Sequence, residues 1–103
     1  MRTVKTSLTA RRQLKDILTE GVQKFGEDVA DRTATRIDIA VHSLLCHFPD
    51  WFAKEAYRGL HTYAVPKTPV VVAYNFDEKE LRVHFIFHQG QNREGWKPTD
   101  AQW

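Results

Sequence analysis

The chain lacks several features that would place it in a specialised class of protein. Cys46 is the only cysteine among 103 residues, so no internal disulfide can form and a reducing compartment is expected. No apolar run approaches the roughly 18 residues of a membrane-spanning helix. The basic start of the chain is not followed by the apolar core of a signal peptide. These absences favour a cytoplasmic protein with no membrane partner.

Strong net charge is also lacking, because the overall balance is +2, but the charges are unevenly distributed. Residues 1–26 carry six Lys or Arg and two acids, whereas residues 27–50 carry two Arg and five acids. Arg11, Arg12 and Lys15 fall in the first turns of an expected helix, where the helix dipole disfavours positive charge. They are candidates for binding an acidic partner segment, and a solvated basic face is the alternative. So small a surplus does not indicate that the chain alone binds nucleic acid.

What is present is a clear hydrophobic periodicity, which changes along the chain. Residues 2–8 alternate as a short strand, and a 3.6-residue period then predicts two amphipathic helices. Thr9 is the expected N-cap of the first helix, Gly26 the break between the two, and Pro49 the end of the second. A two-residue period returns further on and predicts three strands. The expected helices span 10–25 and 27–47, and the later strands 59–65, 69–76 and 80–88, with a loop over 50–59.

The order β-α-α-β-β-β predicts an α+β fold. A helical hairpin packs on one face of a four-stranded, mostly antiparallel sheet, and the other face is left for water or a partner. One domain is expected over residues 1–103. Pro98 discourages regular structure after it, so a disordered tail over residues 97–103 is one expectation.

Strict alternation along the last strand assigns its side chains to two faces. Arg82, His84 and His88 are expected on the open face, together with Ile86, and His61 could join them. Such a face could bind a phosphate, and histidines suit acid–base chemistry near neutral pH. The alternative is the polar side of a half-buried sheet that a partner covers. The side chains expected to face the helices are Leu81, Val83, Phe85 and Phe87.

Neither a metal site nor a cofactor is indicated. The strand rise places His84 and His88 about 13 Å apart, too far to share one ion. Cys46 has no neighbouring cysteine and falls at the edge of an apolar helical stripe, so a small core residue is expected there.

Five segments resemble parts of one known family: "LTARRQLKDIL", "FGEDVADR", "LLCHFP", "RGLHTYAV" and "VVVAYNFDEKELRVHFIFHQG". Together they cover roughly residues 3–96, and they resemble the RelE/ParE superfamily of toxins from bacterial type II toxin–antitoxin modules. Members similar to RelE cleave messenger RNA on the ribosome, whereas members similar to ParE poison DNA gyrase. The resemblance implies a cognate antitoxin as partner, and either gyrase or the ribosome as target.

Two positions favour the ParE-like branch. Nuclease members usually carry an Arg three residues before the Tyr that closes the middle strand, where this chain has Val71, and no Tyr follows His88. The resemblance therefore implies a toxin that inhibits gyrase or a comparable target by binding. One alternative is a ribosome-dependent endoribonuclease that uses Arg82, His84, His88 and Arg93. A second alternative is an inactive member that acts only as an interaction module.

The segment "REGWKPTDAQW" contains Arg93 and Trp96, residue types that anchor protein interfaces. In ParE-like members this end matters for toxicity, so both residues are assigned to target binding; the alternative for Trp96 is packing on the sheet edge. The residues assigned to antitoxin binding are Arg11, Arg12, Lys15, His61, Arg82 and His84.

Overall fold

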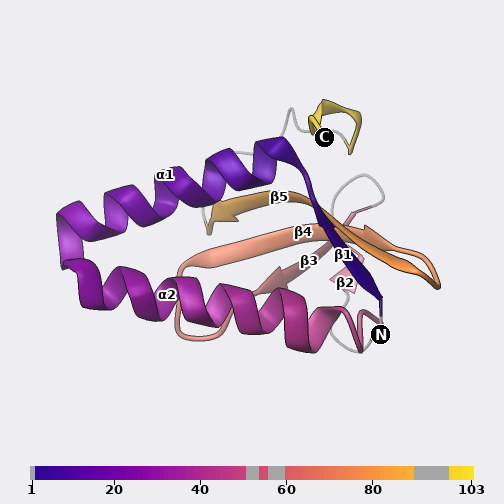
Figure 1. Cartoon of the computed structure of the whole chain (residues 1–103), viewed down its shortest axis with the longest axis horizontal. Coiled ribbons are helices and arrows are strands. Elements are labelled where there is room, and N and C mark those ends of the chain that lie inside the picture. Colours follow the sequence, from indigo (N-terminus) through magenta and orange to yellow (C-terminus); the bar gives the residue numbers. More distant parts are fainter. Residues whose placement is uncertain (1, 51–53, 56–59, 90–97) are drawn as a thin grey trace.

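The expected α+β arrangement is present in the computed structural model, which describes residues 2–50, 54–55, 60–89 and 98–103. Two helices form an antiparallel hairpin that lies across one face of a sheet (Figure 1). The strand order is β1-β5-β4-β3-β2, in which β1 is parallel to β5 and all other neighbours are antiparallel. The elements are β1 (Thr3–Thr6), α1 (Leu8–Phe25), α2 (Glu27–Ile39), the π-helical segment η1 (Ala40–Leu45), β2 (Lys54–Glu55), β3 (His61–Ala64), β4 (Val70–Phe76), β5 (Glu80–His88) and the 3₁₀ turn η2 (Pro98–Asp100).

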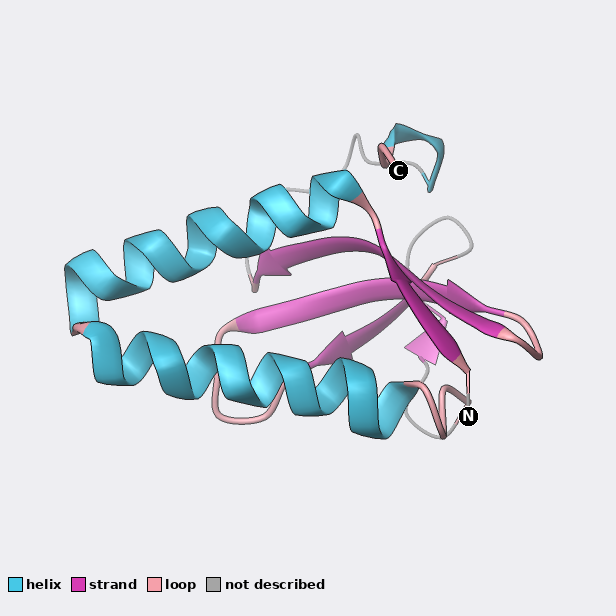
Figure 2. Ribbon diagram, in the orientation of Figure 1, coloured by secondary structure: helices cyan, strands magenta, loops and turns pink. Residues whose placement is uncertain are grey.

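The sheet has one strand more than the sequence predicts. β2 lies in the segment expected to be a loop, and its two residues pair with β3 at the edge of the sheet. The other four strands are the ones that the sequence predicts. One of them, β1, forms the edge of the sheet opposite β2 (Figure 2).

The first helix begins earlier than expected, because Ser7 rather than Thr9 is its N-cap. The Ser7 side chain accepts a hydrogen bond from the Ala10 amide at 2.9 Å. Thr9 binds elsewhere, since its hydroxyl accepts from the Gln102 amide at 2.9 Å. The break at Gly26 is as predicted, and Gly26 has a φ of 88°.

The second helix continues almost as far as expected, but its last turn is π-helical. The Cys46 amide donates to the Val41 carbonyl at 3.3 Å, which is an i to i−5 bond. Two adjacent pairs of buried residues are five positions apart here: Ala40 and Val41, then Leu45 and Cys46. A regular α-helix would rotate the second pair away from the core, whereas the wider π turn keeps both pairs buried. Cys46 is thus a core residue, as predicted.

β5 contains a bulge that reverses the alternation of its side chains. Ala73 of β4 pairs with Phe85 and the next residue, Tyr74, pairs with Val83, so His84 is an extra residue without a counterpart on β4. Leu81 and Val83 therefore face the helices as predicted, but beyond the bulge Ile86 takes that place. The assignment of Phe85 and Phe87 to the helical side is wrong, because one extra residue exchanges the two faces.

The face of the sheet opposite the helices is also apolar and covered. Phe85 and Phe87 lie there, 3% exposed each, in a cluster with Val71 and Ala73 of β4. Among the described residues, Leu60 and Ala101 complete this second cluster. The expectation that this face is left for water or a partner is therefore wrong for these positions.

Residues 98–103 pack against the start of α1 rather than forming a disordered tail. The Gln102 carbonyl accepts from the amides of Leu8 at 2.5 Å and Thr9 at 3.3 Å, which have no acceptor within the helix. Trp103 lies edge-on against His84, with ring centroids 4.9 Å apart. Main-chain groups make the first two of these contacts, so the residue types in the tail gave no sign of them.

Candidate functional site

The tip of the helical hairpin extends beyond the sheet that supports it. Figure 1 shows α1 and α2 continuing past the ends of β4 and β5. The apolar stripe of α1 also continues, although the sheet beneath it has stopped. As a result Val22 is 41% exposed and Phe25 is 67% exposed. Large apolar side chains left uncovered in this way are typical of binding surfaces.

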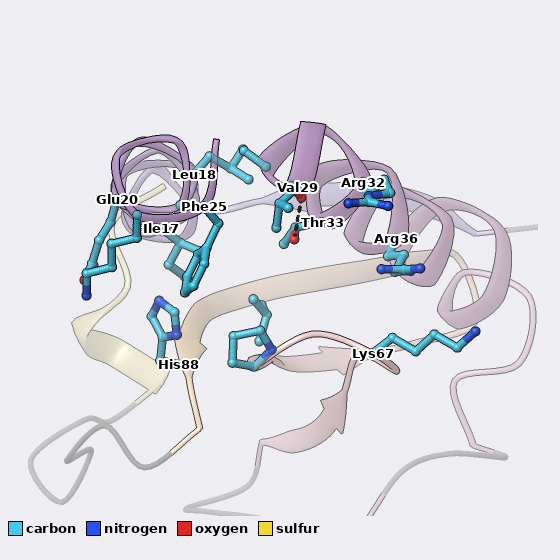
Figure 3. A pocket seen from close by; sticks show the side chains of 15 residues that line it. Ile17, Leu18, Glu20, Phe25, Val29, Arg32, Thr33, Arg36, Lys67 and His88 are labelled. Atoms are coloured by element: carbon cyan, nitrogen blue, oxygen red, sulfur yellow. Dashed lines mark hydrogen bonds and ion pairs between the residues drawn. The ribbon is translucent and has the colours of Figure 1, made fainter. Parts of the chain in front are cut away.

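A groove of about 460 Å³ lies under this tip, bounded on the sheet side by the start of β4 and the end of β5. We call it the hairpin groove. Its apolar part comes from both helices and from the first residues of β4, and Figure 3 shows the side chains around it. The lining residues are Ile17, Leu18, Glu20, Gly21, Lys24, Phe25, Val29, Ala30, Arg32, Thr33, Arg36, Lys67, Pro69, Val70 and His88.

Two of the charged lining residues neutralise each other. Lys24 donates to Glu20 at 2.5 Å, four residues away on α1. This hydrogen bond and the charge of Lys24 lower the pKa of Glu20, and His88 nearby adds a smaller effect in the same direction. The α1 wall of the groove is therefore close to neutral.

Three more cations line the groove away from α1. Arg32 and Arg36 are one turn apart on α2, and Lys67 lies across from them in the turn between β3 and β4 (Figure 3). Within the described part of the chain, none of the three forms an ion pair. The groove thus combines an apolar floor and a nearly neutral α1 side with cations on α2 and on the β3–β4 turn.

The turn that carries Lys67 is held in an uncommon conformation. Lys67 has a φ of 62°, the left-handed region that side chains other than glycine seldom adopt. The Thr68 hydroxyl fixes the turn, since it donates to the Val65 carbonyl at 2.9 Å and accepts from the Val70 amide at 3.2 Å. Local hydrogen bonds therefore keep Lys67 beside the groove.

Three of the residues proposed from the sequence as a nuclease site lie in the described ranges, Arg82, His84 and His88, and these three do not come together. Arg82 lies at the β4–β5 hairpin, where it donates to Asp77 at 2.9 Å, to Glu80 at 3.1 Å and to Asn75 at 2.8 Å. The hydrogen bonds to Asp77 and Glu80 raise the pKa of Arg82. The hydrogen bond from Arg82, followed by those from two backbone amides, lowers the pKa of Asp77 to about 2. Arg82 is thus engaged in holding the hairpin closed.

The histidines are separated as well. His84 is 6% exposed at the bulge beneath Trp103, whereas His88 is at the far end of β5 beside the hairpin groove. The strand rise puts Arg82 and His88 roughly 20 Å apart. Because the bulge turns His88 toward the helical side, the expected shared face of Arg82, His84 and His88 does not exist.

His61 also lies on the helical side of the sheet rather than on the open face. Its ring is 5.7 Å from that of Tyr74 and 5.4 Å from that of Phe76. The Tyr74 hydroxyl donates to the Pro49 carbonyl at 2.9 Å, and burial raises the pKa of Tyr74 to about 12. Tyr74 is therefore a structural hydrogen-bond donor that connects the end of the second helix to the sheet.

The remaining predicted site residues fall in two places. Arg11, Arg12 and Lys15 are exposed on α1 and do not line the groove, and Arg12 contacts the Gln102 side chain at 3.5 Å. Arg93 and Trp96, assigned to target binding, lie outside the described residues.

In the described ranges no three His, Cys, Asp or Glu side chains are grouped so that they could bind a metal ion. None of the described helices is both long and apolar enough to span a membrane.

Comparison with known proteins adds a structural likeness. No protein-family model and no curated protein matches the sequence. A chain from the chromosomal ParDE toxin–antitoxin system of P. aeruginosa superimposes with a TM-score of 0.72 at 21% identity, covering 85% of this chain and 96% of that one. The chain has the RelE/ParE fold. A chain from the RelBE2 toxin–antitoxin complex of Mycobacterium tuberculosis gives a TM-score of 0.62 at 17% identity, covering 85% of this chain and 98% of that one.

The grouping of Arg32, Arg36 and Lys67 around the hairpin groove is the feature that the sequence reasoning missed. The four-residue spacing of Arg32 and Arg36 was a visible signal, because it places both on one face of a helix. No such signal existed for Lys67, which is 31 residues further along than Arg36. Only the packing of the β3–β4 turn against the hairpin brings it near them.

Proposed function

We propose that this protein is the toxin of a type II toxin–antitoxin module, of the ParE-like branch. It acts in the cytoplasm by binding and inhibiting an essential target such as DNA gyrase, and a cognate antitoxin neutralises it. The RelE/ParE fold supports the proposal, since a chain from a ParDE system matches over 96% of its length. The observation that carries it is the hairpin groove, which no side chain of the described residues fills and where Phe25 is 67% exposed, because a toxin that is held inactive needs a surface for its inhibitor.

The dispersal of the polar residues favours inhibition by binding over RNA cleavage. Catalysis by phosphoryl transfer requires an acid, a base and a cation around one phosphate. Here Arg82 is paired with two carboxylates, and His84 is buried under Trp103. Val71, at the position where nuclease members carry an Arg, is 7% exposed in the second apolar cluster. We assign target binding to Arg93 and Trp96, on the segment that follows β5.

The proposal is tested first in cells. Expression of this chain alone should arrest growth, and co-expression of a short reading frame adjacent to its gene should restore it. Growth without arrest would contradict the toxin assignment.

The second test separates the targets in vitro. Purified protein should cause gyrase-dependent breaks in supercoiled DNA and leave ribosome-bound messenger RNA intact. His88→Ala should retain this activity, whereas Arg93→Ala combined with Trp96→Ala should lose it. Cleavage of messenger RNA on ribosomes that His88→Ala abolishes would instead establish the endoribonuclease alternative.

A further inference from the structure

We propose that the hairpin groove is a binding site for a single-chain anionic amphiphile, a small molecule with an unbranched apolar tail and a carboxylate or phosphate head. The buried floor of the groove receives the tail, and Arg32, Arg36 and Lys67 bind the head. This inference does not depend on the toxin assignment, because it concerns a small ligand of the free chain.

The floor of the groove sets the requirement for an apolar tail. Ile17 and Val70 line it, belong to the main core cluster and are 9% and 0% exposed. Gly21 and Ala30 face each other where α1 meets α2, since a methyl group added at Gly21 would lie 3.9 Å from that of Ala30, and both are too small to fill the groove. The groove therefore reaches the surface of the core. A tail that enters it removes apolar surface of both molecules from water.

The size of the groove suits a small molecule. Its volume of about 460 Å³ lies within the range of small-molecule pockets, roughly 300–1,000 Å³. Phe25 projects from the end of α1 at the rim and is 67% exposed, whereas the floor is buried (Figure 3). Because the floor is recessed, a flat membrane surface does not reach it, but a single extended chain does.

Charge sets the requirement for an anionic head. Lys24 and Glu20 form an ion pair, so the α1 side contributes almost no net charge. Arg32, Arg36 and Lys67 form no ion pair with any described residue. Arg32 and Arg36 are four residues apart on α2 and so about 6 Å apart along its axis. One carboxylate or phosphate between them can accept hydrogen bonds from both guanidinium groups.

The cations and the apolar rim lie on different sides of the groove. Figure 3 shows Phe25 and Val29 on one side of the view and Arg36 with Lys67 on the other. An inorganic anion would contact only the cations and leave the apolar floor in water. An uncharged apolar molecule would fill the floor and leave the cations without a partner. A tail joined to an anionic head satisfies both parts, and this favours an amphiphile.

The turn that carries Lys67 is already fixed without a ligand. The Thr68 hydroxyl donates to the Val65 carbonyl and accepts from the Val70 amide, and Lys67 has a φ of 62° within this turn. A ligand therefore orders only the side chain of Lys67 and not its backbone, which reduces the entropic cost of binding.

Titrations of the isotope-labelled full chain, followed by amide chemical shifts, test the inference with defined probes. One series contains alkanoates of about six to about twelve carbon atoms, each kept below its critical micelle concentration, because each buried methylene should add a constant increment of affinity. A second series has a constant tail and a variable head: decanoate, decyl phosphate, decanol and decyltrimethylammonium. The amides of Gly21, Ala30 and Val70 report on the groove.

We expect affinity to rise roughly threefold to fourfold for each added methylene until the tail fills the groove. Decanoate and decyl phosphate should bind at least about tenfold more tightly than decanol, and decyltrimethylammonium more weakly than decanol. Inorganic phosphate alone should bind far more weakly than decyl phosphate, because it has no tail.

Three variants separate the head from the tail. Arg32→Glu with Arg36→Glu should remove the preference for anions and leave the affinity for decanol within about twofold. Arg11→Glu with Lys15→Glu is the control for net charge, since it is also a pair four residues apart on a helix without a buried residue, and it should not change the preference. Val29→Trp, a change at a half-buried lining position, should fill the groove and weaken every ligand.

Circular dichroism establishes that each variant is folded. The inference is overturned by affinity that does not rise with tail length, by an anion preference that survives reversal of Arg32 and Arg36, or by shift changes confined to residues away from the groove. Inorganic phosphate that binds as tightly as decyl phosphate would indicate an ion site only and would also overturn it. Groove binding of phosphatidylglycerol vesicles, or of an acidic apolar peptide, without binding of free decanoate would overturn it in favour of a membrane or a partner protein.

Discussion

Ser7 joins the start of α1 to the bulge in β5. Its hydroxyl donates to the His84 carbonyl at 2.6 Å while accepting from the Ala10 amide at 2.9 Å, and its own amide donates to the Val83 carbonyl at 2.9 Å. This contact lies at the bulge, where His84 has no register partner on β4. One fully buried side chain thus fixes both the helix start and the exchange of faces in the last strand.

Ser7→Ala should lower the free energy of unfolding by about 2–3 kcal/mol, since it removes an N-cap together with the hydrogen bond that the Ser7 hydroxyl donates to a buried carbonyl. Thr9→Ala is the control, because Thr9 is the cap that sequence reasoning favours and its hydroxyl accepts from the Gln102 amide at an exposed position. We expect Thr9→Ala to lower it by less than about 1 kcal/mol. Urea unfolding followed by circular dichroism measures both. An equal or larger loss from Thr9→Ala would mean that the helix begins where the sequence suggested.

The order and type of the main elements could be predicted because each carries its own periodicity. The stripe of α1 and the break at Gly26 depend on residues close together in the chain. The bulge could not be predicted, since Phe85, Ile86 and Phe87 are all apolar and either face could have been the helical one. The correct assignment depends on Ser7, which is 77 residues away from the His84 carbonyl it binds.

The candidate site was harder to predict for the same reason. Phe25 belongs to the apolar side of α1, but its exposure depends on where β4 and β5 end in space. Strict alternation along β5 would place Arg82 and His88 on one face, whereas the extra residue at the bulge puts them on opposite faces. The partners of Arg82 at Asp77 and Glu80 are local, yet the sequence alone did not distinguish a hairpin ion pair from a phosphate site.

Replacement by alanine should change the free energy of unfolding in opposite directions at the two glycines near the hairpin turn, Gly21 and Gly26. Gly21 lies within α1, and an added methyl group would meet the nearest side chain, that of Ala30, at 3.9 Å, an ordinary contact. Gly21→Ala should therefore raise the free energy of unfolding by about 0.5–1 kcal/mol through helix propensity. Gly26→Ala should lower it by about 1–3 kcal/mol, because a φ of 88° with ψ 168° is a conformation that essentially only glycine adopts.

Comparison of Gly21→Ala with Gly26→Ala tests whether a loss of stability at Gly26 comes from its backbone conformation. An added methyl group at Gly26 meets nothing within 4 Å, so a loss there cannot come from a clash. Thermal unfolding monitored at equal protein concentration would measure both variants. A neutral Gly26→Ala would show that the link between α1 and α2 adopts another conformation in solution.

The carboxylate of Asp77 should make stability depend on pH in the acid range. Its Oδ1 accepts from the amides of Lys79 and Glu80 at 2.8 Å each, and its Oδ2 accepts from Arg82 at 2.9 Å. These bonds lower the pKa of Asp77 from about 3.8 to about 2, with the Arg82 hydrogen bond the largest cause. A carboxyl group with a lowered pKa stabilises the fold fully above its unfolded value, and this contribution is lost as pH falls toward the folded value.

Asp77→Asn keeps an acceptor oxygen for the two amides and removes the charge. We expect the variant to be less stable than wild type at about pH 7, with the difference unchanged down to about pH 4 and nearly absent at about pH 2. Urea unfolding of both proteins at several pH values gives this difference directly. About 1 M salt at neutral pH should reduce the difference, since the pair with Arg82 is partly exposed. A difference that persists unchanged at about pH 2 would show that the charge of Asp77 does not stabilise the β4–β5 hairpin.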